Sequence, residues 1–200
     1  MSLHVDEGTS VTAEPEASNM LAVNYVDQVM THWCWAACAE MIFTFKGMDI
    51  SKCDVVKRDL EILFGAANDT TLQNPCGQPS SDAALSSNIA CMSNTPSYVY
   101  NCWFHLYCAR QGPGLSTSGI TNLIKNQIDL ATPIHMQDSF HAVVITGYHV
   151  DGSGDITDLN INDPDSGTGV GVQDFNDPDY FDWPHTTFFY DFGNNSGFPC

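Results

Sequence analysis

The stretch that decides the fold is Thr31-His32-Trp33-Cys34-Trp35-Ala36-Ala37-Cys38-Ala39-Glu40-Met41-Ile42-Phe43. It is rich in alanine, methionine and other helix-compatible residues, and its apolar side chains cover nearly every helical face. A helix that is apolar all round is buried, so we predict a buried helix here that ends at Gly47. Cys34 stands in the first turn, where the helix macrodipole favours a thiolate. Cys34 is therefore a candidate nucleophile, although a structural core cysteine also fits this position.

The remaining predicted elements are helices in the first part of the chain and strands in the second. A second helix is predicted from the capping Ser51 toward Phe64, and a third over 116–130. Strands are predicted at 132–136, 141–150, 156–161 and 186–190, and helices followed by strands predict an α+β fold. The polar residues 1–20 are predicted to be a disordered or loosely attached arm. Residues 21–200 are predicted to form one domain, with a helical half over about 25–130 and a β-rich half over 131–200.

Composition limits the function classes. The 200 residues include 24 acids and six Lys or Arg, for a formal net charge of −18, which excludes nucleic acid as a main partner. No apolar run approaches the length of a membrane span. The chain has eight cysteines but few lysines, which is typical of an exported protein, secreted or periplasmic, with some disulfides. Its leader would then be absent from this sequence.

A second functional segment is a predicted hairpin in the β-rich half. His141 begins an apolar, β-branched stretch, and an Asp/Gly-rich turn should fold it back on the next strand. If the turn centres near Gly152, His141 faces Asp163, with Cβ atoms about 4.5–5.5 Å apart. A carboxylate there can fix the tautomer of the imidazole and stabilise its charged form. A shift of one or two residues would bring Asn162 or Asp165 to that position instead.

Acyl transfer also needs donors for the oxyanion. Gln28 lies six residues before Cys34, and its side-chain amide together with the Cys34 backbone N–H can form such a hole. Trp33, Trp35 and Phe140 flank the predicted cysteine and histidine and are candidate substrate-binding residues.

These residues resemble the papain-like cysteine peptidases. The resemblance rests on Gln28 and Cys34-Trp35-Ala36, then His141-Ala142-Val143, then Asn162-Asp163-Pro164, and it covers about 25–172. It is strongest for the compact bacterial branch, which includes secreted and effector peptidases and peptidases that process double-glycine leaders. The resemblance implies a helical left subdomain with the cysteine, an antiparallel β right subdomain with the histidine and aspartate, and a site in the cleft between them. It implies hydrolysis of a peptide or protein by a Cys-His-Asp triad with a glutamine oxyanion hole, without metal or cofactor.

Several alternatives stay open at this stage. The same triad can support transpeptidation or deamidation, and a degenerate homologue could only bind peptides. A disulfide between Cys34 and Cys38 would favour the inactive form, although a regular helix makes that bridge difficult. If Cys34 is the nucleophile, seven cysteines remain, so at least one more lacks a partner within the chain. His105 suggests zinc and the 151–155 loop suggests calcium, but a hairpin turn explains the loop better.

Overall fold

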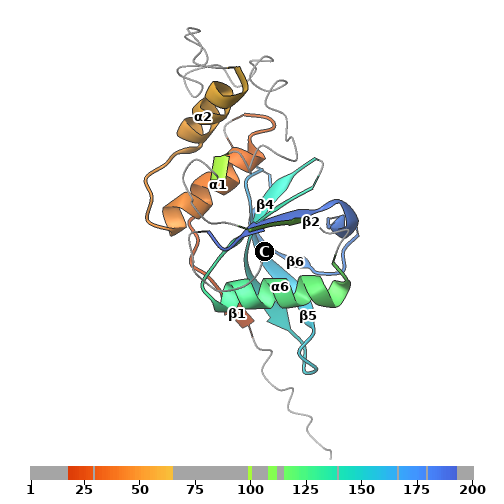
Figure 1. Ribbon diagram of the computed structural model, residues 1–200. Coiled ribbons are helices and arrows are strands. Elements are labelled where there is room, and N and C mark those ends of the chain that lie inside the picture. The colour runs from red at the N-terminus through yellow and green to blue at the C-terminus, as the bar shows by residue number, and fades with distance from the viewer. Residues whose placement is uncertain are drawn as a thin grey trace, which may run out of the picture.

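The computed structural model describes residues 18–28, 30–64, 99–100, 108–111, 115–138, 140–165, 167–178 and 180–192. The predicted α+β fold is confirmed, because helices and an antiparallel sheet make up the described chain (Figure 1). The elements are β1 (Ser18–Met20), α1 (Cys34–Phe45), α2 (Lys52–Phe64), β2 (Cys108–Gln111), α6 (Thr117–Asp129), β3 (Ile134–Gln137), β4 (Ala142–Val150), β5 (Ile156–Asp163), β6 (Gly169–Asp174), the 3-10 helix η3 (Trp183–His185) and β7 (Thr187–Tyr190).

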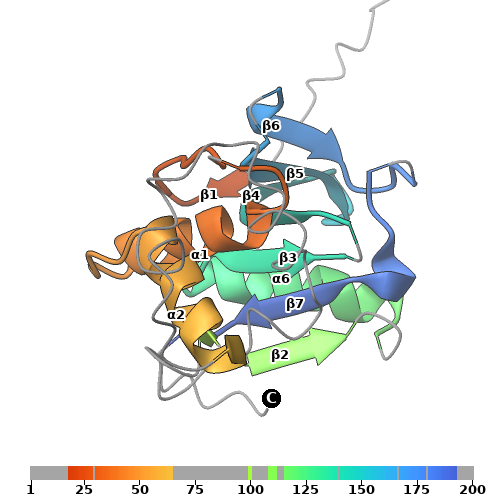
Figure 2. The ribbon, with the colours of Figure 1, turned by 90° about the horizontal axis from the view of Figure 1, so that it is seen from above.

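The strands form one sheet in the order β2-β7-β3-β4-β5-β6 (Figure 2). Every described strand pair is antiparallel. Strand β1 pairs with the far end of β4, beyond the part of β4 that pairs with β3. The residues of β1 belong to the segment that was predicted as a loose arm, so the described end of that segment is attached to the sheet.

A helix packs on each face of the sheet, as the side chains of strand β4 show. Its residues Ala142 and Val144 belong to the core cluster built on α1. The alternate residues Val143 and Ile145 belong to the cluster that contains the apolar face of α6. Because successive side chains of a strand point to opposite faces, α1 and α6 pack on opposite sides of β4. This strand therefore fixes the helix that carries Cys34 against the sheet that carries the histidine and aspartate.

Helix α1 begins three residues later than the sequence predicted. The backbone of His32 has a φ of 71°, a left-handed conformation that is uncommon for residues other than glycine and that delays the start of the helix. Trp33 is the N-cap residue, and Cys34 is the first helical residue. The predicted place of Cys34 in the first turn is therefore confirmed. The predicted burial is also confirmed, because nine of the twelve residues of α1 are buried.

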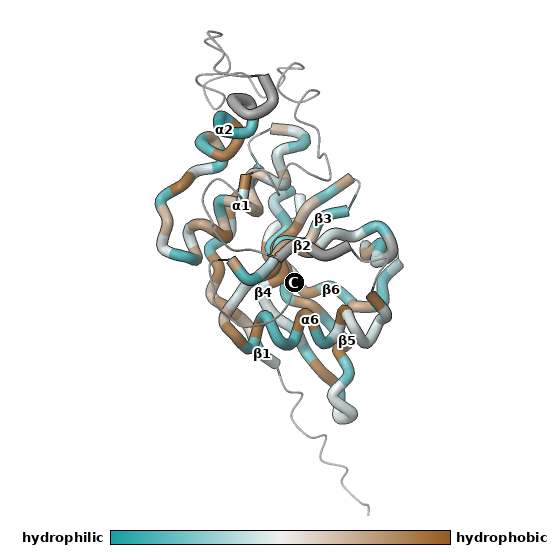
Figure 3. The backbone as a smooth tube through the Cα atoms, in the orientation of Figure 1, coloured by the Kyte–Doolittle hydropathy of each residue, from teal (hydrophilic) through white to brown (hydrophobic). Residues whose placement is uncertain are grey.

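The other two helices begin where their caps predict. Ser51 Oγ accepts a hydrogen bond from the Asp54 backbone N–H at the start of α2, and Asp54 Oδ2 accepts one from the Ser51 backbone N–H. Ser116 caps α6 by accepting from the Gly119 backbone N–H at 3.2 Å. Helix α6 alternates between hydrophobic and hydrophilic stretches along its length (Figure 3). Its buried residues lie at helical spacing and are Ile120, Leu123, Ile124, Gln127 and Ile128.

The predicted register of the central hairpin was wrong by two residues. In strands β4 and β5, Val144 lies opposite Asn162 and Ile145 opposite Ile161, so continuing this pairing puts Asp163 opposite Val143. The turn is centred on Ser153 rather than on Gly152, because the Asp151 backbone N–H donates to the Asp155 carbonyl at 3.0 Å. A shift of two residues keeps each side chain on its original face of the sheet.

Candidate active site

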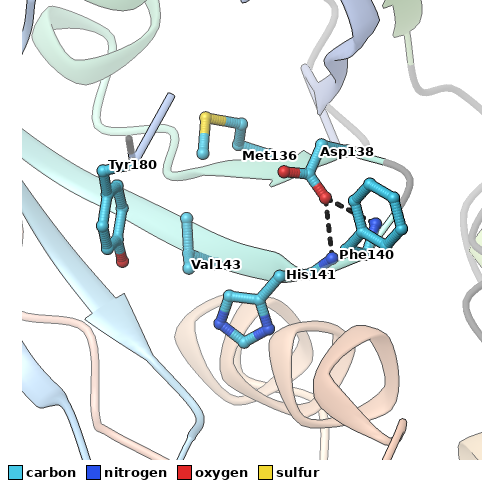
Figure 4. Close-up of a pocket in the computed structure, with 6 residues that line it drawn as sticks. All are labelled: Met136, Asp138, Phe140, His141, Val143 and Tyr180. Atoms are coloured by element: carbon cyan, nitrogen blue, oxygen red, sulfur yellow. Dashed lines mark hydrogen bonds between the residues drawn. The ribbon is translucent and has the colours of Figure 1, made fainter. Parts of the chain in front are cut away.

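A tight turn before β4 places His141. The Asp138 backbone N–H donates to the His141 carbonyl at 3.0 Å. In the reverse direction, Asp138 Oδ1 accepts from the backbone N–H groups of Phe140 and His141, both at 2.7 Å (Figure 4). These bonds hold the backbone at the start of β4, and with it the Cβ of His141. Sequence reasoning missed this role of Asp138, although an aspartate two or three residues before a strand is a known turn signal.

His141 and Asp163 meet despite the shifted register. The distance from His141 Nε2 to Asp163 Oδ1 is 2.6 Å. Diagonal neighbours on adjacent strands are farther apart than directly opposite ones, but a long side chain such as histidine can span the gap. The Asp163 side chain is only 4% exposed, whereas that of His141 is 34% exposed. The carboxylate is therefore the buried anchor, and the imidazole reaches from it toward solvent.

The imidazole also contacts the cysteine of α1. His141 and Cys34 share a hydrogen bond, and because Nε2 already faces Asp163, Nδ1 is the nitrogen that faces the sulfur. Burial alone would lower the pKa of His141, but its bonds with Asp163 and Cys34 outweigh burial and raise the pKa to about 10. The imidazole is thus charged at neutral pH, and a thiolate beside it would be stabilised both by this charge and by the helix N-terminus.

Three donors hold the Asp163 carboxylate. His141 and the Asp165 backbone N–H bind Oδ1, the latter at 3.0 Å, and the Tyr180 hydroxyl donates to Oδ2 at 2.9 Å. Burial raises the pKa of Asp163, but these bonds outweigh burial and keep it below its ordinary value. Tyr180 was not predicted as a site residue, because it lies in an Asp-rich segment whose course the sequence did not indicate. The lesser candidate Asp165 acts only through its backbone, and the side chain of Asn162 instead donates to the Val23 carbonyl.

The structure brings Gln28 to the same region. The Gln28 backbone N–H donates to the Pro164 carbonyl at 2.8 Å, directly after Asp163. Its side-chain oxygen Oε1 is buried and has no hydrogen-bond partner in the described parts of the chain.

The three residues expected to contact substrate differ in their exposure. Trp33 and Trp35 are both 0% exposed and pack in the core cluster around α1, so the prediction that they bind substrate was wrong. Their large apolar side chains anchor the start of α1 instead. Phe140 is 85% exposed and lines a pocket of about 290 Å³ beside His141. The other lining residues are Met136, Asp138, Val143 and Tyr180 (Figure 4).

The second cysteine of α1 is a buried thiol. Neither Cys34 nor Cys38 is part of a disulfide, which excludes the Cys34–Cys38 bridge in this structure. Burial raises the pKa of Cys38 well above its usual value, so this thiol is a poor nucleophile. His105 and most of residues 80–114 lie outside the described chain. Within the described residues, no group of three or more His, Cys, Asp or Glu is arranged to hold a metal ion.

Comparison with known protein families assigns the chain to a family of this fold. A family model described as the Peptidase_C39 like family matches residues 20–183. The chain therefore belongs to this family, which places it among the papain-like cysteine peptidases, as the resemblance predicted, and supports cysteine peptidase activity and a peptide substrate at the level of the family. A search of curated proteins finds no match. None of the described helices has the length and hydrophobicity needed to cross a membrane.

Proposed function

We propose that this protein hydrolyses peptide bonds with Cys34 as nucleophile, His141 as general base and acid, and Asp163 as the group that orients His141. The observation that carries the proposal is the chain of contacts from Cys34 through His141 to Asp163, with 2.6 Å between His141 Nε2 and Asp163 Oδ1. A nucleophile in contact with a base, and a base held by a third group, is the arrangement that covalent catalysis requires.

The reaction follows from these positions. The Cys34 thiolate attacks the carbonyl carbon of the scissile bond, and the carbonyl oxygen gains the negative charge. The Gln28 amide and the Cys34 N–H are proposed to bind that oxygen. The His141 imidazolium then gives its proton to the leaving amine, and the C–N bond breaks. Water, losing a proton to His141, attacks the thioester, and cleavage of the C–S bond restores the thiolate.

A labelling experiment tests the nucleophile. An epoxysuccinyl thiol probe at neutral pH is expected to modify Cys34 and to leave the buried Cys38 unmodified, as peptide mass mapping would show. The matched control is Cys34→Ala, which should take up no probe. A native protein that stays unlabelled at Cys34 would refute the proposed nucleophile. Product masses from a peptide library then separate hydrolysis, which gives two fragments, from deamidation, which adds about one dalton to an intact peptide, and from transpeptidation, which joins fragments.

We also propose that the protein is secreted or periplasmic. Cys53 is disulfide-bonded, and disulfides persist in oxidising compartments. The excess of acidic residues is compatible with such a location but does not require it. Alkylation of the protein in extracts of its native cells, before and after reduction, is expected to show Cys53 protected until reduction. Protein whose Cys53 is alkylated before reduction would contradict an oxidising location.

A further inference from the structure

The pocket beside His141 combines apolar walls with one polar group. Met136 and Val143 lie next to each other on paired strands and give it an apolar base. The rings of Tyr180 and Phe140 form two further walls. At about 290 Å³ the pocket lies near the lower limit of ligand pockets, which span roughly 300–1,000 Å³, so it suits one side chain rather than a larger ligand.

Asp138 supplies the polar group. Its Oδ1 is occupied by the backbone N–H groups of Phe140 and His141. Figure 4 shows the second carboxylate oxygen on the side of Asp138 that faces Met136, away from Phe140. None of the described Lys, Arg or His side chains forms an ion pair with Asp138. The charge of Asp138 also acts on Tyr180, where it adds to burial and to Asp163 in raising the pKa of the phenol.

We propose that this pocket binds a lysine or arginine side chain of the peptide substrate, at a position next to the scissile bond. The aliphatic stem would lie along Met136 and Val143, and the cationic head would meet the second oxygen of Asp138. The exposed ring of Phe140 would add a cation–π contact. The position next to the scissile bond follows because His141, which contacts Cys34, also lines the pocket. This inference rests on the proposed peptidase function and specifies its substrate class.

A different residue type in the substrate would fit less well. An acidic side chain would face Asp138 at close range, and like charges in a partly enclosed site repel. A purely apolar side chain would fill the base but leave the second carboxylate oxygen without its cationic partner. Selectivity between lysine and norleucine, which share a straight aliphatic chain, therefore isolates the contribution of Asp138.

The test uses internally quenched peptide libraries in which one position at a time is lysine, norleucine or glutamate. The native protein is expected to show a kcat/KM for lysine about tenfold or more above that for norleucine at one position near the cleaved bond, the size of a charge-assisted hydrogen bond. Asp138→Asn keeps an oxygen that can accept the two backbone N–H groups, and it should lower the ratio below about threefold. Asp138→Lys should make the glutamate peptide the better substrate.

Asp49→Asn is the matched control, because it removes the same charge at an exposed position beyond the other end of α1. It should leave the lysine-to-norleucine ratio unchanged. The assays are repeated in about 0.5 M NaCl, which screens the long-range attraction of a strongly acidic protein for basic peptides. A ratio that persists in salt and is lost in Asp138→Asn supports the pocket.

Three results overturn the inference while the proposed function stands. One is equal cleavage of lysine and norleucine peptides at every position, and another is a lysine preference that Asp138→Asn does not reduce. Labelling of Cys34 by the epoxysuccinyl probe without cleavage of any lysine peptide also overturns it. If Cys34 is not labelled and no peptide is cleaved, the proposed function itself is wrong and the substrate inference falls with it.

Discussion

At the scale of single residues, the contact between His141 and Asp163 links folding to chemistry. Asp163 is almost fully buried and accepts bonds from the Tyr180 hydroxyl and the Asp165 N–H as well as from His141. Removing a partner from a buried charge is costly, because the remaining charge loses part of its compensation. The imidazole is therefore held by a carboxylate that the fold itself positions, and this geometry makes two predictions about single residues.

The first prediction concerns the dependence of stability on pH. His141 has a pKa of about 10 in the folded protein and about 6.5 when unfolded, so its protonated form stabilises the fold fully below about pH 6.5. This contribution is expected to decrease as the pH rises from 6.5 to 10, because only the folded state still binds the proton there. The measurement is the free energy of unfolding in urea for the native protein and for His141→Ala at several pH values.

The difference between these two proteins should shrink across that range. His185→Ala serves as the control, since His185 is exposed and its aspartate partner, Asp182, is also exposed. A difference that stays constant or grows between pH 6.5 and 10 would show that His141 is not held as a cation in the folded state.

The second prediction concerns Tyr180 as a positioning residue. Tyr180→Phe keeps the ring in the pocket and removes only the hydroxyl that donates to Asp163 Oδ2. Because this bond lowers the pKa of Asp163, its loss should raise that pKa and move the acidic limb of the kcat/KM profile to higher pH. We expect the plateau to fall by up to about tenfold, since two of the three donors remain. An unchanged acidic limb would show that Tyr180 contributes packing alone.

At the scale of elements, the chain shows which signals a sequence carries and which it lacks. Helix α6 was predicted from the helical spacing of its apolar residues, α1 from its helix-compatible composition and α2 from its capping serine. Strand β4 was predicted from its apolar, β-branched residues, and β3, β5 and β7 were also predicted as strands. Strand β6 was missed because its glycines weaken the strand signal and its valines, Val170 and Val172, face solvent. Strand β1 was missed because three residues, Ser18-Asn19-Met20, at the end of a polar segment are too few to show a strand pattern.

The candidate site, like the fold, could be predicted only in part from the sequence. Cys34, His141 and Asp163 were identified because each has a position in a periodic element that its chemistry needs. The register was wrong because the bonds of Asp151 to Ser153 and Asp155 centre the turn one residue later than Gly152, and such bonds cannot be read from hydrophobic periodicity. Trp33 was predicted to bind substrate because it is adjacent to Cys34 in the sequence. That prediction failed because adjacency in sequence does not tell which side chains of a turn are buried.

The element prediction concerns Gly147, which lies opposite Met20 where β1 pairs with β4. A Cβ at this position would lie 2.5 Å from the Asn19 backbone oxygen and 2.9 Å from Met20 Cα. Gly147→Ala is therefore expected to push β1 from the sheet and to destabilise the fold by roughly 1–3 kcal/mol, the usual cost of overpacking. The measurement is the midpoint of urea unfolding.

Gly171→Ala is the matched control, because a Cβ there meets nothing within 4 Å and the residue also lies in a strand. That substitution should be neutral or slightly stabilising, since alanine restricts the unfolded chain. Equal destabilisation by the two substitutions would contradict a specific contact between β1 and Gly147.

At the scale of the whole molecule, one segment joins the two halves of the site. Residues 21–28 run beside the sheet, where the Leu21 N–H donates to Thr146, Asn162 donates to Val23, and Gln28 donates to Pro164. The same segment then leads into α1 and Cys34. Residues 21–28 therefore connect the β-rich half to the helix of the nucleophile through two backbone bonds and one bond from the Asn162 side chain.

The excess of acidic residues affects the stability of the whole molecule and gives the last prediction. With a net charge of −18, the compact state repels itself more than the expanded unfolded chain does. Raising NaCl from about 20 mM to 0.5 M should screen this repulsion and raise Tm, by about 2–4 °C if screening recovers about 1 kcal/mol. The double variant Asp49→Lys/Asp158→Lys has less net charge, so its Tm should rise less over the same range. A Tm that falls with NaCl, or rises equally in both proteins, would show that general charge repulsion does not limit the stability of this fold.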